Sequence, residues 1–185
     1  MTTAIPTLAP TALPSSLPTV VRGPDHEFDF RGCSDSSATA DTGFNGTGIT
    51  ATAKNGANCS AEGMVFDGSD DYVDVTPWPF GGEAMTVEAY VKYDTFGSYS
   101  RIFDFSDGTS SDNVVLSLHS LDGDGTGTAR FDVVVGSTFA TLDTSSSSFF
   151  EMDVWTHVVA TVDGTTMKLY KNGALTDTKT DGQEP

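Results

Sequence analysis

The segment that most constrains the fold is residues 154–178. It contains three apolar, strand-forming runs separated by the turn sequences Asp163-Gly164 and Asn172-Gly173. Asp, Asn and Gly tolerate the positive φ values of tight hairpin loops, whose twist matches that of the flanking strands. The segment therefore predicts a three-stranded antiparallel meander, and with it an all-β chain.

The rest of the chain, from Phe28 onward, repeats short apolar runs between clusters of Gly, Asp, Ser and Thr. Turn signals at intervals of about 10 residues are typical of a β-sandwich or jelly roll. The clearest strand is 85–93, where Met, Val, Ala, Val and Tyr alternate with the other residues. One face of this strand should therefore pack on the core and the other should be exposed to solvent. Weaker strand patterns occupy residues 100–105, 113–118 and 129–135.

Two further patterns concern helices and the position of one strand. No window shows the 3.6-residue apolar periodicity of an amphipathic helix, so we expect almost no helix. Residues 154–162 are apolar on both faces. They therefore predict a central strand that is covered on each side.

The N-terminal stretch has a different composition. Prolines stand at positions 6, 10, 14 and 18 among Ser and Thr, which blocks both helix and sheet ladders. We expect residues 1–24 to form an extended linker or stalk, either O-glycosylated or a disordered tail without glycans, and residues 25–185 to form the domain. The first residues lack the basic start and apolar block of a secretory signal, so export is either not encoded here or its signal lies upstream.

The charge of the chain limits its partners. There are 26 acidic and 9 basic residues, a formal net charge of −17. Such a chain repels phosphate backbones and anionic membranes, so we expect no nucleic-acid partner and a neutral or cationic ligand. No apolar run approaches the roughly 18 residues of a membrane-spanning helix, so we expect no membrane insertion of this segment.

The chain has two cysteines, Cys33 and Cys59. They permit one disulfide, which would contribute roughly 3 kcal/mol through loop closure in an oxidising compartment. Two free thiols in a cytosolic protein are the alternative. Two cysteines and three widely spaced histidines do not supply the four clustered ligands of a structural zinc site.

Several motifs, taken together in their order and spacing, resemble a laminin-G-like module, the concanavalin A-like lectin/glucanase jelly roll of secreted and cell-surface proteins. The resemblance extends from about residue 27 to residue 185. The motifs that carry it are residues 28–33, 63–73, 85–91, 101–105 and 155–173.

The resemblance implies an antiparallel two-sheet β-sandwich, a jelly roll, in an extracellular or cell-surface protein. It also implies a Cys33–Cys59 disulfide, because many such modules carry one near their start. Such modules commonly end with an Asp-bearing strand that returns beside the first strand. No such strand is found in this sequence, so we expect the jelly roll to lack its final strand or strands.

A calcium site is expected in the Gly-containing turn at residues 67–71. Asp67, Asp70 and Asp71 supply hard carboxylate oxygens at a spacing that suits calcium. The resemblance implies one structural calcium near this turn, with Asp70 or Asp71 as the side-chain ligand. Ordinary turn chemistry, which also favours Asp and Gly, is the alternative.

A second acidic segment, residues 121–128, begins like an EF-hand loop with Asp122, Asp124 and Gly127. The twelfth position, however, is Val133 instead of the bidentate glutamate, and no flanking helices are expected. A hairpin loop is the better interpretation.

Catalysis is not expected. The fold hosts glycoside hydrolases, but the retaining enzymes among them need two carboxyl groups about 5 Å apart. Glu151 and Asp153 supply no second glutamate, and Glu88 has no carboxylate two or four residues away. His157 lies on an apolar strand, where we expect a buried, hydrogen-bonded side chain and not a base.

The aromatic residues Trp78, Tyr90, Phe96 and Tyr99 are candidates for stacking on a sugar, with packing at the sheet ends as the alternative. Asn45-Gly-Thr47 and Asn58-Cys-Ser60 fit the N-glycosylation pattern. Asn45 is the favoured acceptor, because Asn58 adjoins the expected disulfide.

These observations favour a non-catalytic extracellular module that recognises a glycan or glycoprotein, with a structural calcium ion. Two alternatives remain open. One is a protein-adhesion module without sugar specificity, and the other is an ancillary domain of a larger secreted glycoside hydrolase.

Overall fold

The computed structural model describes residues 24–31, 33, 39–79, 82, 84–106, 112–122 and 126–185, with the backbone alone at 120–122. Every regular element in these residues is a β-strand, so the all-β expectation is confirmed. The described part of the chain accordingly contains no helix that could cross a membrane. The Pro-rich stretch expected to be a linker lies, through residue 23, outside the described residues.

The chain is divided into two compact units. The first consists of Met1–Phe66 and Asp71–Pro77, and the second of Asp67–Asp70 and Trp78–Pro185. Both are built from antiparallel strands.

The first unit contains a three-stranded sheet and a short two-stranded ribbon. The sheet has the order β1-β2-β5, with bounds Thr39–Ala40, Thr50–Lys54 and Tyr72–Val75. The ribbon pairs β3 (Asn58–Cys59) with β4 (Met64–Val65). A disulfide joins Cys33 to Cys59 across a Cα–Cα distance of 5.5 Å, as the resemblance implied.

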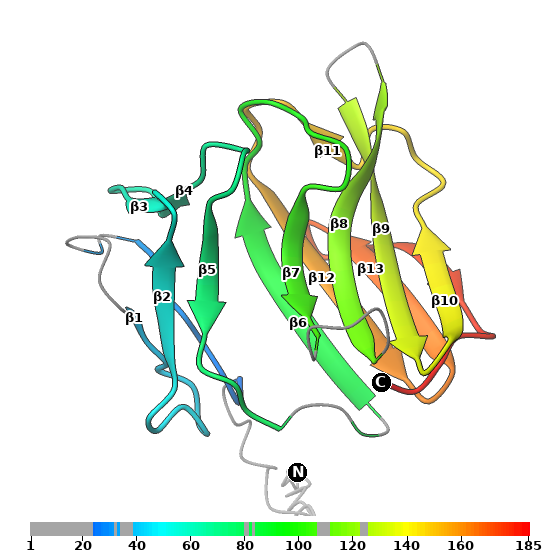
Figure 1. Cartoon of the computed structure of the whole chain (residues 1–185). Helices are drawn as coiled ribbons and strands as arrows, with labels where there is room; N and C mark the ends of the chain where they lie inside the picture. The colour runs from blue at the N-terminus through cyan, green and yellow to red at the C-terminus, as the bar shows by residue number, and fades with distance from the viewer. Residues whose placement is uncertain are drawn as a thin grey trace, which may run out of the picture. The chain divides into compact units, whose positions relative to one another are not determined.

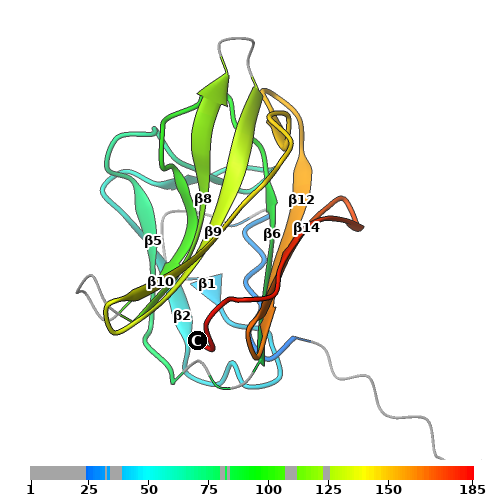
Figure 2. The same ribbon diagram turned by 90° about the vertical axis from the view of Figure 1, so that its right-hand side faces the viewer.

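The second unit is a two-sheet sandwich (Figure 1). One sheet has the order β10-β9-β8-β7, with β11 also pairing β9. The other has the order β14-β13-β12-β6. Figure 2 shows β8, β9 and β10 in one layer and β6, β12 and β14 in the other. The strand bounds are β6 Ala84–Val91, β7 Arg101–Phe105, β8 Asn113–Asp122, β9 Thr126–Val135, β10 Thr138–Asp143, β11 Phe150–Glu151, β12 Thr156–Asp163, β13 Thr166–Lys171 and β14 Ala174–Lys179.

The core of the second unit lies between its two sheets. Along β9, residues 127 to 133 alternate between buried and half-buried positions, as expected of a strand with one covered face. Burying a large apolar side chain contributes about 1.5–3 kcal/mol, and the core gathers such side chains from both sheets. Its largest fully buried members are Phe131, Phe149, Phe150, Leu116, Leu118, Met167, Leu169, Val133, Val158 and Val162.

The meander predicted from residues 154–178 is confirmed as β12, β13 and β14. Its second turn places both Asn172 and Gly173 at positive φ, 50° and 81°. The Asn172 side-chain oxygen also accepts a hydrogen bond from the His157 backbone N–H at 2.9 Å. The predicted strand at 85–93 appears as β6, whose residues alternate between exposed and half-buried.

β12 was expected to be a central strand covered on both faces. The central position is confirmed, but one of the two faces is not fully covered. β12 is central, because it pairs with both β13 and β6. Its second face is only half-buried, however, at His157, Val159 and Thr161. The His157 side chain is 37% exposed, and its Nε2 lies 3.4 Å from Glu88, so the expectation of a buried histidine was wrong.

The acidic segment 121–128 is placed at a hairpin, as expected. β8 and β9 pair on either side of it, with Asp122 opposite Thr126. The loop residues 123–125 themselves lie outside the described residues.

Candidate functional site

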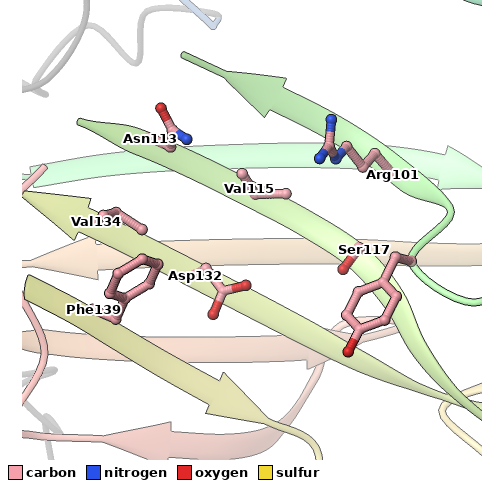
Figure 3. A pocket seen from close by; sticks show the side chains of 8 residues that line it. Arg101, Asn113, Val115, Ser117, Asp132, Val134 and Phe139 are labelled. Carbon is pink, nitrogen blue, oxygen red and sulfur yellow. The ribbon is translucent and has the colours of Figure 1, made fainter. Parts of the chain in front are cut away.

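The solvent-facing side of the β7–β10 sheet contains a hollow of about 200 Å³. Its residues occupy the strand positions that alternate with the core positions, so the same pleat that fills the sandwich also builds this surface. Eight residues line it: Tyr99, Arg101, Asn113, Val115, Ser117, Asp132, Val134 and Phe139. Figure 3 shows Asp132 and Ser117 inside the hollow, with Phe139 and Arg101 toward opposite corners.

The register of the strands arranges these side chains in rows. One row is Asn113, Val134 and Phe139, and a second is Val115, Asp132 and Thr141. Ser117 and Val134 are buried at 3% and 5% exposure, so they form the floor. The hollow therefore has an apolar and a polar part side by side.

Asp132 is the acidic group of the hollow. Its Oδ1 accepts a hydrogen bond from the Thr141 hydroxyl at 2.6 Å. Burial raises the pKa of this carboxyl group, and the Thr141 hydrogen bond opposes that shift only in part. No described basic residue forms an ion pair with Asp132.

The basic residues around the hollow are held by other carboxylates. Arg130 donates two hydrogen bonds to Asp143, at 2.7 and 2.9 Å, which raise the pKa of Arg130 and lower that of Asp143. Arg101 forms an ion pair with Asp104 at 2.8 Å. A bidentate guanidinium–carboxylate pair is among the stronger charge-assisted contacts, so Arg130 is well fixed in this arrangement.

Two exposed aromatic rings belong to the hollow. Phe139 is 66% exposed and Tyr99 is 59% exposed. Tyr99 has a φ of 61° and lies edge-on to His119, with 5.0 Å between ring centroids. Such a backbone conformation costs a bulky residue on the order of 1–3 kcal/mol and is often found at functional sites.

The structure brings one of the four predicted aromatics, Tyr99, into this hollow. Trp78 is half-buried and packs edge-on against Phe105, and Phe96 packs against the core. Tyr90 is exposed, but Trp155 stacks parallel to its ring at 5.0 Å, and Lys92 lies 5.4 Å from the Trp155 centroid. The contacts of Trp78 and Phe96 are those expected of side chains that pack at the sheet ends instead of stacking on a sugar.

Other residues of the hollow were missed by sequence reasoning. Arg101, Asp132 and Phe139 were not singled out, although Asp132 lies on the wet face of a predicted strand. Period-two alternation was the available signal. This alternation predicts which residues of a strand share a face, but not the register between strands. The register is what brings the residues of the hollow together.

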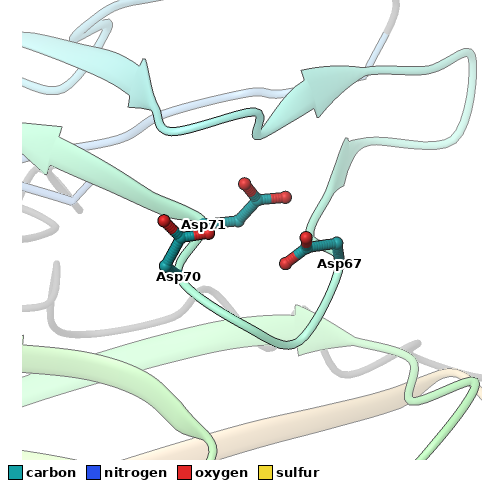
Figure 4. A group of neighbouring side chains, drawn as sticks. All are labelled: Asp67, Asp70 and Asp71. Carbon is teal, nitrogen blue, oxygen red and sulfur yellow. The ribbon is translucent and has the colours of Figure 1, made fainter.

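The acidic turn between β4 and β5 gathers Asp67, Asp70 and Asp71. One carboxylate oxygen from each lies within 4.8 Å of the others, and Figure 4 shows the three side chains around this turn. Asp67 also accepts a hydrogen bond from the Ser69 backbone N–H at 2.8 Å, which is ordinary turn chemistry. The set of hard oxygen donors suits a calcium ion.

The predicted glycosylation acceptor Asn45 is exposed, and its side-chain amide donates a hydrogen bond to Asp25 at 3.0 Å. Asn58 is also exposed, directly before the disulfide-bonded Cys59. Modification of Asn45 remains a prediction.

The second unit is thus a β-sandwich with a hollow of about 200 Å³ on one sheet face. The chain belongs to the concanavalin A-like lectin/glucanases superfamily, whose laminin-G-type family model matches residues 67–185. Among solved structures, it is similar to residues 221–444 of an S-layer domain-containing protein from Clostridium thermocellum ATCC 27405. That similarity has 23% identity and a TM-score of 0.46, over 88% of this chain and 75% of the other. A search of curated proteins finds no match.

Proposed function

We propose that this chain is a non-catalytic binding module that recognises a glycan, free or on a glycoprotein, through the hollow of the β7–β10 sheet. The observation that carries the proposal is the combination of exposed rings at Phe139 and Tyr99 with polar groups on the same sheet face. Binding sites for small molecules typically join aromatic surface to a few placed polar groups. Sugars present an apolar ring face and hydroxyl edges, which match such a surface.

Binding is favoured over hydrolysis by the chemistry of the hollow. Among its lining residues, Asp132 is the carboxylate. Cleavage of a glycosidic bond ordinarily needs two carboxyl groups at a defined separation, one as acid and one as base or nucleophile. A single carboxylate can orient a hydroxyl or an amine, which is sufficient for recognition.

Two features support an extracellular or cell-surface setting for this function. The Cys33–Cys59 disulfide persists most readily in an oxidising compartment. The Asp67, Asp70 and Asp71 turn would hold a calcium ion where that ion is abundant, and we assign it a structural role in stiffening the turn.

The test is glycan binding by variants that remove one ring each, Tyr99→Ala and Phe139→Ala. We expect each to weaken binding by about two- to twelvefold, since aromatic contacts contribute roughly 0.5–1.5 kcal/mol. Tyr72→Ala is the matched control, because Tyr72 is 50% exposed and lies on β5, outside the hollow. Unchanged binding in both hollow variants would place the glycan elsewhere and contradict the proposal.

A further inference from the structure

We propose that the ligand of the hollow carries a positively charged amine, as an oligosaccharide of unacetylated amino sugars does, and that Asp132 binds this amine. The inference rests on the proposed function and specifies the ligand class of the same site.

Asp132 is the carboxylate that lines the hollow, and no ion pair in the described part of the chain includes it. Asp132 is half-buried, and the Thr141 hydroxyl that donates a hydrogen bond to it is neutral. Arg130 is held by Asp143 and Arg101 by Asp104, so neither basic side chain of the surround is paired with Asp132. A half-buried carboxylate gains most from a charged donor, because an opposite charge compensates its lost hydration.

Phe139 lies close to the Asp132 carboxylate on the neighbouring strand. Phe139 lies opposite Val134, and Thr141 lies opposite Asp132, so Phe139 and Asp132 are diagonal neighbours on adjacent strands. Diagonal pairs on one sheet face are about 7–8 Å apart, within reach of an aromatic ring. Figure 3 shows the Phe139 ring beside the Asp132 carboxylate. A sugar ring lying on Phe139 could therefore direct an attached ammonium group to Asp132, and the ring adds cation–π attraction.

Charge also discriminates between a cationic sugar and other sugars. The chain has a formal net charge of −17, so sulfated or uronic-acid chains are repelled by the whole molecule as well as by Asp132. A neutral or acetylated sugar can donate hydrogen bonds to Asp132 but adds no positive charge to that of Arg130, whose attraction offsets the effect of burial only in part. A cationic sugar adds a positive charge beside Asp132 and is also attracted by the chain as a whole.

The assignment predicts a dependence of binding on pH. Burial raises the pKa of Asp132, so this carboxylate loses its charge earlier than ordinary aspartates as the solution is acidified. The charged and titratable groups around it are Arg101 on β7, His119 on β8, Arg130 on β9 and Asp143 on β10, with Tyr99 at the rim. Over the acidic range in which the sugar amine stays fully protonated, amine binding should therefore weaken as the pH falls.

The experiment is calorimetric titration of the full chain with a glucosamine tetramer and an N-acetylglucosamine tetramer. We expect the glucosamine tetramer to bind about tenfold more tightly. Asp132→Asn should abolish this preference, so that the two tetramers bind alike, and with it the acid dependence of the preference. Asp94→Asn is the control, since it makes the same charge change at an exposed residue outside the hollow.

The outcomes separate this inference from the proposed function. Equal binding of the two tetramers, or a preference that survives in Asp132→Asn, overturns the inference and leaves glycan binding standing. Binding of a trilysine peptide as tight as that of the glucosamine tetramer also overturns it, because general charge attraction would then be sufficient. Failure to bind any saccharide would remove the proposed function together with the inference. Should Asp132→Asn fold poorly, the pH dependence of the native chain tests the same point. No weakening over the acidic range in which the glucosamine tetramer is fully protonated contradicts the role of Asp132.

Discussion

Asp132 and Asp41 are both shielded from solvent, yet their pKa values move in opposite directions. For Asp132, burial dominates and the pKa rises, since Thr141 is its main hydrogen-bond donor. For Asp41, burial also acts to raise the pKa, but the Glu27 and Gly43 backbone N–H groups and the His26 ring together lower it. Asp41 accepts several hydrogen bonds in its charged form and therefore has a structural role. Asp132 accepts fewer, so its carboxylate can still bind a ligand.

Asp41 is expected to stabilise the first unit. Its carboxylate accepts hydrogen bonds at 2.8 Å from both Glu27 and Gly43 and at 2.6 Å from His26, and its side chain is fully buried. Asp41→Ala leaves these donors without an acceptor, so we expect a loss of about 2–3 kcal/mol in the free energy of unfolding, measured by urea titration. Asp74→Asn, an exposed change on β5, should stay within about 0.5 kcal/mol of the native chain.

The sign of the pH effect at Asp41 follows from its lowered pKa. A carboxyl group with a pKa lower in the folded than in the unfolded state stabilises the fold above its unfolded pKa. That contribution disappears as the pH falls through the lowered, folded pKa. The stability gap between native chain and Asp41→Ala should therefore be largest near neutral pH and narrow in strong acid. A gap that widened on acidification would refute this account.

At the residue scale, sequence reasoning identified Tyr99 but not its partners. Tyr99 was one of four aromatic residues proposed as candidates for stacking on a sugar. Asp132 and Phe139 carry no local signal of that kind, since an aspartate or a phenylalanine on the wet face of a strand is common. Their importance arises from register, which places β9 and β10 side by side.

At the scale of elements, local signals were sufficient for the strands joined by tight turns. The Asp163-Gly164 and Asn172-Gly173 sequences predicted β12 to β14 because the turn chemistry lies within the residues concerned. The pairing of β12 with β6, by contrast, joins segments more than sixty positions apart, with His157 opposite Tyr90. Such pairing depends on the whole core, so the sequence predicted β6 as a strand without giving its neighbour.

The acidic turn between β4 and β5 is the element for which a ligand effect is expected. Asp67, Asp70 and Asp71 carry like charges close together, so a bound calcium ion would relieve their repulsion. We expect millimolar calcium to raise the melting temperature of the native chain by a few degrees, through preferential binding to the folded state. Differential scanning calorimetry with calcium and with chelator measures the shift.

The matched variants for the calcium effect are Asp70→Asn and Asp74→Asn. Both remove one negative charge from an exposed aspartate, but only Asp70 belongs to the turn. Asp70→Asn should reduce the calcium-dependent shift, whereas Asp74→Asn should retain it. If the native chain shows no shift at all, the turn is explained by Asp and Gly turn chemistry, and the calcium assignment is wrong.

At the scale of the molecule, composition and the order of motifs predicted the class of fold, and the structure confirms an antiparallel β-sandwich. The division into two compact units was not predicted. Short pieces such as β1, β3 and β4, each of two residues, leave no periodic pattern in the sequence. Strands with a long hydrophobic pattern, such as β8 and β9, can be predicted from the sequence. Strands that pair over only two residues and are held by turns and a disulfide cannot.

The disulfide provides a test of how far the two units are independent in stability. Cys33 and Cys59 both belong to the first unit, and the bridge should contribute roughly 3 kcal/mol by restricting the unfolded chain. Reduction should therefore accelerate amide hydrogen exchange in β2 and β5 while leaving β8 and β9, in the core of the second unit, protected. A Cys33→Ser, Cys59→Ser double variant should show the same pattern without reductant and no further response to it. Equal acceleration in both units would mean that they unfold as one cooperative structure, because loss of the bridge would then be felt throughout the chain.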